Sequence, residues 1–380
     1  MLCVATVFPG LMPATLSFAQ ARTTDRSALR VYLGTATRHG SQGVYLATLD
    51  RETGWLSEPA LVAEINRPTF LAADALGEHL YAVAEKPGSQ GSAMGIIQAF
   101  AVDRGTGGLT AMNHQPSGGD GPCHLTVDPN NEAVLAANYG SGSVAVLPIE
   151  RGVGLGEASC VVQHVGSSVH PDRQTAPHAH AIQVHPEGRF ALAADLGVDQ
   201  LLVYRYGGLR LEQASSFAAA PGAGPRHFAF HPNLDMVYLI NELDSTVLTL
   251  QFDATQGTLR QLQCITSLPA EFKGTNYPSE VAVHPSGGFL YGANRGHNSL
   301  AAFGIDAATG LIKPAGHVSV QGDFPRHFAM DPTGCFLIAA NERSDDLAVF
   351  RIDMETGLPH FTGQHVSLGA PMSVLYQPMP

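Results

Sequence analysis

Histidine, arginine and glutamate side chains follow a proline that recurs along the chain. The recurring prolines are Pro68, Pro122, Pro177, Pro225, Pro278, Pro325 and Pro371. One residue after them stand Thr69, Cys123, His178, Arg226, Ser279, Arg326 and Met372. Two residues after them stand Phe70, His124, Ala179, His227, Glu280, His327 and Ser373. Imidazole exchanges protons near neutral pH, and guanidinium binds carboxylate or phosphate through a planar fork. Gathered in one place, these side chains suit acid–base chemistry on a small anionic molecule.

The spacing of the prolines indicates which fold gathers these side chains. Successive prolines are separated by 46 to 55 residues. A period of roughly 50 residues built from short apolar strands is typical of a β-propeller with one blade per repeat. The repeat therefore predicts an all-β, seven-bladed β-propeller with four-stranded antiparallel blades. The innermost strand of each blade lines a central channel, so we expect the residues after the prolines around one end of it.

The fourth repeat indicates how the strands of one blade follow one another. The first strand follows Pro225, apolar and β-branched residues continue over 236–243 and 246–252, and a fourth edge strand is expected near 261–266. Tight-turn residues separate these segments, as in His231-Pro232-Asn233. No segment of the chain shows sustained helical periodicity, so we expect no helix.

The two ends of the repeat region are expected to build one blade together. Residues 30–57 supply strands without a proline phrase, and residues 370–376 supply a proline phrase without the other strands. The C-terminal segment would then be the innermost strand of a shared blade. This closure leaves no open sheet edge along the ring. We expect a single propeller domain over residues 29–380.

A second set of polar residues stands where the next strand of each repeat ends. The pairs are Glu85-Lys86, Asn138-Tyr139, Asp195-Leu196, Asn241-Glu242, Asn294-Arg295 and Asn341-Glu342. A hairpin returns this strand end to the start of the first strand, so both sets should share one face of the disc. The recurring Asn or Asp is expected to hydrogen-bond a turn backbone. The variable residue after it is expected to face the binding site.

The acidic balance of the chain argues against nucleic acid and anionic membranes as partners. The chain has 21 Lys and Arg against 33 Asp and Glu, which gives a formal net charge of -12. No stretch after the N-terminal segment approaches the length of a transmembrane helix. We expect no nucleic acid and no membrane as partner, and the oligomeric state stays open.

No metal or other cofactor is expected. The five cysteines are scattered and include no Cys-x-x-Cys pair, so neither a zinc site nor a disulfide framework is indicated. His178 and His180 stand two residues apart in a strand and would share a face. A third ligand at a distinctive metal-site spacing does not accompany them.

Residues 1–28 stand outside the repeat. Leu2 to Ala19 are mostly apolar, and Ala19-Gln20-Ala21 resembles a signal-peptidase site. However, Pro9 and Pro13 interrupt the apolar run, and no Lys or Arg precedes it. We interpret this leader either as an export signal, which would place the protein in the periplasm or outside the cell, or as a disordered extension or misassigned start of a cytoplasmic protein.

Histidine, glutamate and arginine in one cleft can hydrolyse a lactone. A base activates water, a cation stabilises the tetrahedral oxyanion, and an acid protonates the leaving alkoxide. The same groups can also close a carboxylate onto an alkene to form a lactone. Neither Gly140-Ser141-Gly142-Ser143 nor Gly166-Ser167-Ser168 has the Gly-x-Ser-x-Gly frame, so a covalent serine mechanism is not expected.

Several phrases of the sequence resemble the seven-bladed propeller lactonases, which comprise bacterial 6-phosphogluconolactonases of the cycloisomerase type and fungal carboxymuconate-lactonising enzymes. The resemblance covers residues 30–380. Its most specific phrase is Gly166-Ser167-Ser168-Val169-His170-Pro171-Asp172-Arg173-Gln174, which runs into Pro177-His178-Ala179-His180. Other matching phrases lie at 121–124, 137–140, 224–227, 241–245, 277–280 and 294–297.

The resemblance implies four active-site residues: His178, Glu242, Arg226 and Arg295. It implies that His178 and Glu242 transfer protons while the two arginines hold the anion. The surrounding substrate-binding residues are expected to be His124, Tyr139, His180, His227, Glu280 and Arg326. His327 and Glu342 depart from the family pattern, in which Asn and Gln are expected.

The leading prediction is a lactonase that hydrolyses 6-phosphogluconolactone, so the expected partner is a small anionic lactone. A carboxymuconate-type lactonising enzyme is the first alternative. An exported sugar lactonase acting on an unphosphorylated aldonolactone is the second. The third is a non-catalytic propeller that binds a small anion.

Overall fold

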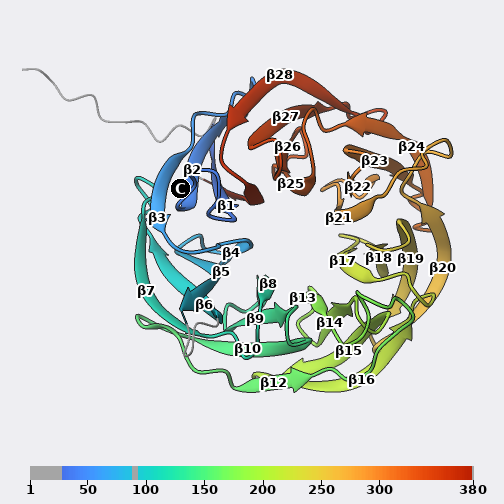
Figure 1. The fold of residues 1–380 in the computed structure, drawn as a ribbon, viewed down its shortest axis with the longest axis horizontal. Helices are drawn as coiled ribbons and strands as arrows, with labels where there is room; N and C mark the ends of the chain where they lie inside the picture. Colours follow the sequence, from blue (N-terminus) through green and yellow to red (C-terminus); the bar gives the residue numbers. More distant parts are fainter. Residues whose placement is uncertain (1–27, 88–92, 379–380) are drawn as a thin grey trace, which may run out of the picture.

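The computed structural model describes residues 28–87 and 93–378, which form a ring of seven antiparallel sheets (Figure 1). The described residues contain no helix, and hence none that is long and apolar enough to cross a bilayer. The seven-bladed β-propeller predicted from the proline spacing is therefore confirmed. Of the possible leader, predicted over residues 1–28, residues 1–27 lie outside the described residues, and Ala28 is the first residue of β1.

Each blade runs from an inner strand at the channel to an outer strand at the rim (Figure 1). The inner strands of blades 1 to 7 are β4 (Leu71–Ala73), β8 (Pro122–Val127), β13 (Ala179–Val184), β17 (Pro225–Phe230), β21 (Tyr277–Val283), β25 (Pro325–Met330) and β29 (Pro371–Pro378). The second strands are β5 (His79–Pro87), β9 (Ala133–Asn138), β14 (Phe190–Asp195), β18 (Met236–Asn241), β22 (Phe289–Arg295), β26 (Phe336–Asn341) and β1 (Ala28–Thr35).

The third strands are β6 (Ala93–Val102), β10 (Ser143–Glu150), β15 (Gln200–Gly207), β19 (Thr246–Asp253), β23 (Ser299–Ile305), β27 (Asp346–Ile352) and β2 (Gly43–Asp50). The outer strands are β7 (Leu109–Pro116), β12 (Cys160–Gln163), β16 (Arg210–Ala218), β20 (Thr258–Thr266), β24 (Ile312–Ser319), β28 (Pro359–Ser367) and β3 (Ala60–Glu64). The short strand β11 (Gly154–Leu155) also pairs with β10. The edge strand expected near 261–266 is β20, which begins three residues earlier.

The burial of a strand depends on its place in the blade. All six residues of β9, β14 and β26 are buried, and their sequences are nearly continuous apolar runs. These second strands pack between neighbouring blades on both faces, as continuous hydrophobic strands do. The outer strand β16 instead alternates, with mostly exposed residues. The main core therefore lies between the blades, close to the channel.

Buried tyrosines form hydrogen bonds between consecutive blades. Tyr32, Tyr238 and Tyr291 lie on second strands and donate hydrogen bonds to the carbonyls of Gly107, Gly310 and Gly357 at 2.7–2.8 Å. Those glycines lie in the last turn of the following blade. Burial with a hydrogen-bond acceptor suits a phenol better than a phenolate, and it raises the pKa of Tyr32 to about 12.

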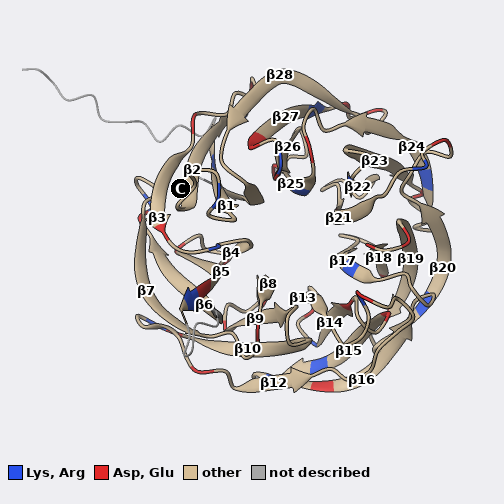
Figure 2. Cartoon of the chain, viewed as in Figure 1, with Lys and Arg blue, Asp and Glu red and all other residues tan. Residues whose placement is uncertain are grey.

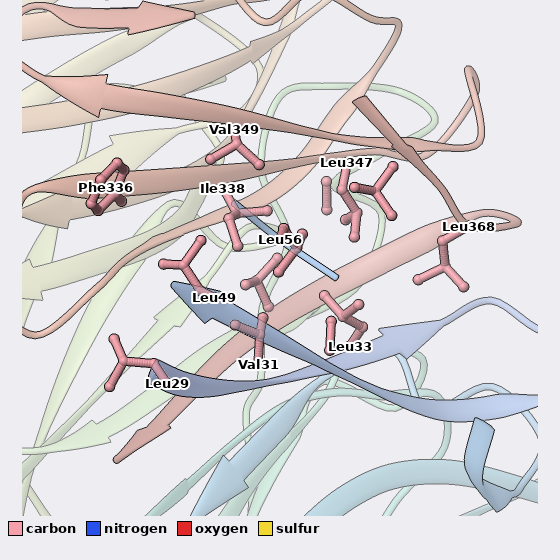
Figure 3. Close-up of a cluster of buried hydrophobic side chains, with 14 residues drawn as sticks. Leu29, Val31, Leu33, Leu49, Leu56, Phe336, Ile338, Leu347, Val349 and Leu368 are labelled. Atoms are coloured by element: carbon pink, nitrogen blue, oxygen red, sulfur yellow. The ribbon is translucent and has the colours of Figure 1, made fainter. Parts of the chain in front are cut away.

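The ring is closed by strands from the two ends of the described chain, as the sequence predicts. The sheet of blade 7 has the order β29-β1-β2-β3, and β29 pairs antiparallel with β1 from Leu29↔Pro378 to Thr35↔Pro371. A buried apolar cluster joins this blade to blade 6 (Figure 3). In it, Val31 and Leu33 of β1 pack with Ile338 of β26 and Leu347 of β27. Closure therefore depends on both backbone pairing and core packing.

Candidate active site

A cavity of about 540 Å³ lies at the end of the channel where the inner strands begin. Residues from all seven blades line it: Arg67, Thr69, Glu85, Gly121, Pro122, Cys123, Tyr139, Gly140, Arg173, His180, Glu242, Tyr277, Arg295, Phe324, Arg326 and Met372. This volume is in the range typical of small-molecule sites. The ring closure is what brings these distant segments together.

A bulge at the start of the inner strands points one residue per blade into the channel. In blade 4, Pro225 pairs with Asn241 and His227 with Ile240, so Arg226 is left between the paired positions. Corresponding register shifts occur in blades 2, 3, 5, 6 and 7. Bulges of this kind re-aim side chains next to active sites. We call these residues, together with Thr69 at the matching position of blade 1, the bulge ring: Thr69, Cys123, His180, Arg226, Ser279, Arg326 and Met372.

The strand register corrects the predicted alignment in blade 3. There Ala179, not Pro177, pairs with the last residue of the second strand, Asp195. His180 therefore occupies the bulge-ring position at which the proline alignment places His178. The spacing of residues in the sequence indicates the same alignment. Sixteen residues separate Pro225 from Asn241 and Ala179 from Asp195, whereas eighteen separate Pro177 from Asp195.

His178 lies beside the cavity rather than in its lining. Its Nδ1 donates a hydrogen bond to the carbonyl of Tyr139 at 2.8 Å, and its ring stacks on the Tyr139 ring with centroids 4.5 Å apart. Its backbone N–H donates to Asp195 Oδ1 at 2.7 Å. Asp195 in turn is held by the buried His164 at 2.6 Å. These contacts fix the wall of the cavity that Tyr139 provides.

His180 reaches the cavity and is neutral at physiological pH. Its ring lies edge-on to Tyr139, with centroids 5.4 Å apart, and its Nδ1 is 3.8 Å from Cys123 Sγ. Burial and then the positive charge of Arg226 lower the pKa of His180 well below its ordinary value. The neighbouring Cys123 is also uncharged, because burial raises its thiol pKa to about 12. His180 is therefore a proton acceptor in the cavity lining, whereas Cys123 is a poor nucleophile.

Glu242 is held by three arginines. Arg173 Nη2 donates to Glu242 Oε1 at 2.6 Å, while Arg226 Nε and Arg295 Nη2 donate to Oε2 at 2.9 and 2.7 Å. Burial alone would raise the pKa of this carboxyl group, but the three guanidinium charges lower it well below its ordinary value. Glu242 therefore stays ionised and is a weak base.

The arginines in this cluster differ in how much freedom they retain. Arg226 is 2% exposed and also donates to the carbonyl of Ser279. Arg295 also donates to the carbonyls of Tyr277 and Pro278. Arg173 is about one-third exposed, and its remaining hydrogen bond goes to the Tyr139 hydroxyl at 3.2 Å. Figure 2 shows a basic segment on the inner strand β17, at the channel edge of the ring, and the sequence of this strand contains one basic residue, Arg226.

Below the bulge ring, a second ring of side chains plugs the channel. The residues in contact with one another in this group are Phe70, His124, His227, Glu280 and His327. Glu280 binds His227 Nδ1 at 2.9 Å and His327 Nε2 at 3.2 Å. The rings of Phe70 and His124 pack with centroids 4.3 Å apart. His124, His227 and Glu280, which the sequence suggests as substrate-binding residues, thus contact one another one layer beneath the main cavity.

The two departures from the family pattern each form a charged contact. His327 shares Glu280 with His227, and burial lowers its pKa to about 4 despite that carboxylate. Glu342 accepts from Arg38 at 2.6 Å, which links blade 6 to blade 7. Neither residue lines the main cavity.

The recurring Asn has the structural role predicted for it. Asn138, Asn294 and Asn341 are fully buried and donate to the backbone carbonyls of Ser117, Ser267 and Val320. Each of these carbonyls follows the outer strand of the preceding blade: β7, β20 or β24. The residue after the Asn then turns into the cavity in the cases of Tyr139, Glu242 and Arg295.

Several lining residues are absent from the sequence-based set of site residues. Arg173 comes from the long loop between β12 and β13. The sequence of this loop is the most specific phrase of the family resemblance, and it could have identified Arg173 as a site residue. Glu85 follows Ala84, which stands sixteen residues after Pro68. Glu85 therefore corresponds to Glu242 and Arg295 rather than to the Asn position. It lines the cavity and binds Arg67 at 3.1 Å.

The part of the chain that the structure describes contains no group of three or more His, Cys, Asp or Glu side chains arranged to hold a metal ion. The histidines near the channel are instead engaged with Glu280, Tyr139 or aromatic rings.

Comparison with known proteins agrees with this architecture. Residues 30–376 match the family model described as "Lactonase, 7-bladed beta-propeller". The chain is 38% identical to the 6-phosphogluconolactonase of Bacillus subtilis over 293 residues, which cover 77% of this chain and 82% of that protein. It is 30% identical to the 6-phosphogluconolactonase of Formosa agariphila over 289 residues, covering 74% of this chain and 80% of that protein.

The structure also resembles a solved lactonase. It matches the periplasmic gluconolactonase of Pseudomonas aeruginosa with a TM-score of 0.88 and 32% sequence identity, covering 93% of this chain and all of that chain. The family match spans most of the chain and includes the bulge ring and the Glu242 cluster. The chain therefore belongs to the seven-bladed β-propeller lactonase family.

Proposed function

We propose that this protein hydrolyses 6-phosphogluconolactone to the open acid. The observation that carries the proposal is one cavity in which a neutral histidine, His180, lies among arginines that already share an ionised carboxylate. The names of the Bacillus subtilis and Formosa agariphila relatives support the choice of substrate. The cavity volume of about 540 Å³ is sufficient for a phosphorylated hexose lactone.

In this proposal, His180 transfers the proton and Glu242 does not. A general base must be unprotonated and must reach the water that it activates. His180 meets both conditions, because it is neutral and lines the cavity. Both oxygens of Glu242 accept hydrogen bonds from arginine, so we assign this carboxylate to holding Arg173, Arg226 and Arg295 in place.

The reaction then proceeds in two proton transfers. His180 removes a proton from water as the water oxygen bonds to the lactone carbonyl carbon. The carbonyl electron pair moves to oxygen, and the cations of Arg173 and Arg295 stabilise this oxyanion. When the tetrahedral intermediate collapses, the bond to the ring oxygen breaks and the histidinium returns the proton to it. Lactone and water thereby give one hydroxy acid.

An unphosphorylated gluconolactone is the second candidate substrate. The similarity to the periplasmic gluconolactonase of Pseudomonas aeruginosa favours it, and the hydrolytic steps would be the same. The two candidates differ in whether the cavity must accommodate a phosphate.

The test measures hydrolysis of both lactones by the purified full-length protein, with the spontaneous rate subtracted. We expect turnover of 6-phosphogluconolactone with a kcat/KM higher than that for δ-gluconolactone. The His180→Ala variant, checked for folding by circular dichroism, controls for contaminating activity. Turnover of δ-gluconolactone alone would favour the second candidate, and no turnover of either lactone above background would overturn the proposed function.

A further inference from the structure

Five arginines line or adjoin the cavity, and four of them are engaged by carboxylates. Arg67 binds Glu85, and the three others share Glu242. The fifth is Arg326, which lines the cavity and has neither a hydrogen bond nor an ion pair with any of the residues in 28–87 and 93–378. Its guanidinium is thus the positive charge in this cavity that is left without an anion.

Arg326 lies where a bound anion could reach its guanidinium. Arg326 is the bulge-ring residue of β25 and borders both the main cavity and a smaller space of about 20 Å³ beneath it. Arg226 borders the same small space. The charge of Arg326 disfavours a second cation nearby and, after burial, is the main cause that lowers the pKa of Arg226 to about 10.

The nearest acidic groups are already occupied. Glu242 accepts from three other arginines, and Glu280 accepts from His227 and His327. The buried guanidinium of Arg226 and the partly buried one of Arg326 repel each other, and an anionic ligand would relieve that cost. A phosphate fits this site in particular, because a guanidinium binds it through two parallel hydrogen bonds.

We propose that Arg326 binds the phosphate of a phosphorylated lactone and makes the cavity selective for phosphorylated over unphosphorylated substrates. This inference rests on the proposed function, because it assigns one end of that substrate. Arg326 belongs to blade 6 and His180 to blade 3, and both side chains line the main cavity and border the small space beneath it. A substrate with its phosphate at Arg326 can place its carbonyl toward His180 and Arg173.

A permanent charge on the bound substrate explains the unpaired guanidinium of Arg326 better than the transient charge of an oxyanion does. The oxyanion exists only during the reaction, whereas Arg326 needs a counter-ion in every bound state. For the oxyanion, the cavity also offers Arg173, which donates to the hydroxyl of Tyr139, the residue whose ring contacts His180. A role of Arg326 at the reacting carbonyl predicts a different kinetic outcome, which the following experiment separates.

The experiment compares kcat/KM for 6-phosphogluconolactone and δ-gluconolactone in the wild type, Arg326→Gln and Arg326→Lys. We expect Arg326→Gln to lower the ratio of the two values at least thirtyfold, mainly through KM for the phosphorylated lactone, and Arg326→Lys to lower it less. Arg351→Gln is the matched control. Arg351 lies on β27 of the same blade and contacts Glu52 on the outer side, away from the cavity, so the ratio should stay at the wild-type value.

Equal losses on both lactones would overturn the inference and assign Arg326 to the shared carbonyl chemistry. An unchanged ratio would overturn it as well. Calorimetric binding of 6-phosphogluconate, gluconate and inorganic phosphate gives a readout that does not depend on turnover. We expect 6-phosphogluconate to bind at least tenfold more tightly than gluconate, with the difference lost in Arg326→Gln. If that difference is found but neither lactone is hydrolysed, the proposed function fails while the phosphate site stands.

Discussion

The histidines and the glutamate of the cavity differ in protonation because their partners differ. His180 is buried beside positive charge, so its neutral form is favoured. Glu242 is equally buried but contacts three guanidinium groups, so its charged form is favoured. The family resemblance pairs His178 and Glu242 as proton carriers. In the mechanism that we propose, they instead support the cavity wall and act as a counter-ion, and His180 transfers the proton.

Replacing the two histidines separately tests this distinction. We expect His180→Ala to lower kcat for lactone hydrolysis by about 100-fold or more, as loss of a general base does. His178→Ala should lower kcat less than about tenfold, because His178 acts through Tyr139 and does not line the cavity. Steady-state kinetics of both variants would measure this. A larger loss of kcat in His178→Ala than in His180→Ala would contradict the assignment.

The pH dependence of the reaction should also report His180. A base works in its unprotonated form, so activity is lost as the pH falls through the pKa of that base. The pKa of His180 lies well below 6.5. We therefore expect kcat/KM to stay level as the pH is lowered through 6.5 and to decline only under more acidic conditions. An acid limb centred at or above 6.5 would argue for a different base.

At the scale of strands and loops, the Glu242 cluster joins the paired strands β17 and β18 of blade 4 to segments of blades 3 and 5. Glu242 follows β18, Arg226 lies on β17, Arg295 ends β22, and Arg173 comes from the loop before β13. One carboxylate thereby connects three consecutive blades at the cavity. The bulges of the inner strands also help to build the site. They turn Arg226 and the residues at the matching positions out of the pleat and toward the channel.

Removing the charge of Glu242 should weaken the connection between the three blades that its carboxylate joins. Glu242→Gln keeps the shape of the side chain but leaves three guanidinium groups without their counter-ion, which costs about 3–5 kcal/mol for a buried pair. Urea unfolding followed by circular dichroism would measure the loss. Glu187→Gln is the control, because the Glu187–Arg189 pair is exposed on both sides and should leave stability unchanged. Equal stability of the two variants would show that the cluster does not hold the blades.

The sequence was sufficient to predict the strands and most of the channel residues, because a period of proline phrases reports the blades directly. It was insufficient in blade 3. The loop between β12 and β13 ends with its own proline, Pro177, two residues before the paired position of Ala179. The pairing of arginines with Glu242 was also beyond sequence reasoning. It depends on which side chains meet across blades, and repeat spacing does not determine that.

At the scale of the whole molecule, stability rests on closing the ring within blade 7 and on packing that blade against blade 6. Leu33 of β1 is completely buried in the cluster that joins these blades (Figure 3). Its backbone pairs with both neighbours, Val374 of β29 and Tyr45 of β2. The last strand of the described chain thus depends on the first for both its hydrogen bonds and its core contacts.

Truncating Leu33 should therefore destabilise the entire propeller rather than one blade. We expect Leu33→Ala to lower the free energy of unfolding by about 2–5 kcal/mol, the usual cost of removing a buried leucine side chain. Leu76→Ala, at a side chain that is 66% exposed, should have little effect. Chemical denaturation with circular dichroism detection would compare them. A partial transition confined to a small fraction of the signal in Leu33→Ala would contradict ring-wide cooperativity.

The same closure determines when blade 7 can be completed during synthesis. The ribosome makes β29 after every other described strand, so β1 waits with an unpaired edge while six blades emerge. During that time the apolar surface between blades 6 and 7 is open to water and to other nascent chains. Met372, which completes the cavity wall, also arrives with β29. The wall of the cavity is thus complete only when the last described strand pairs with β1.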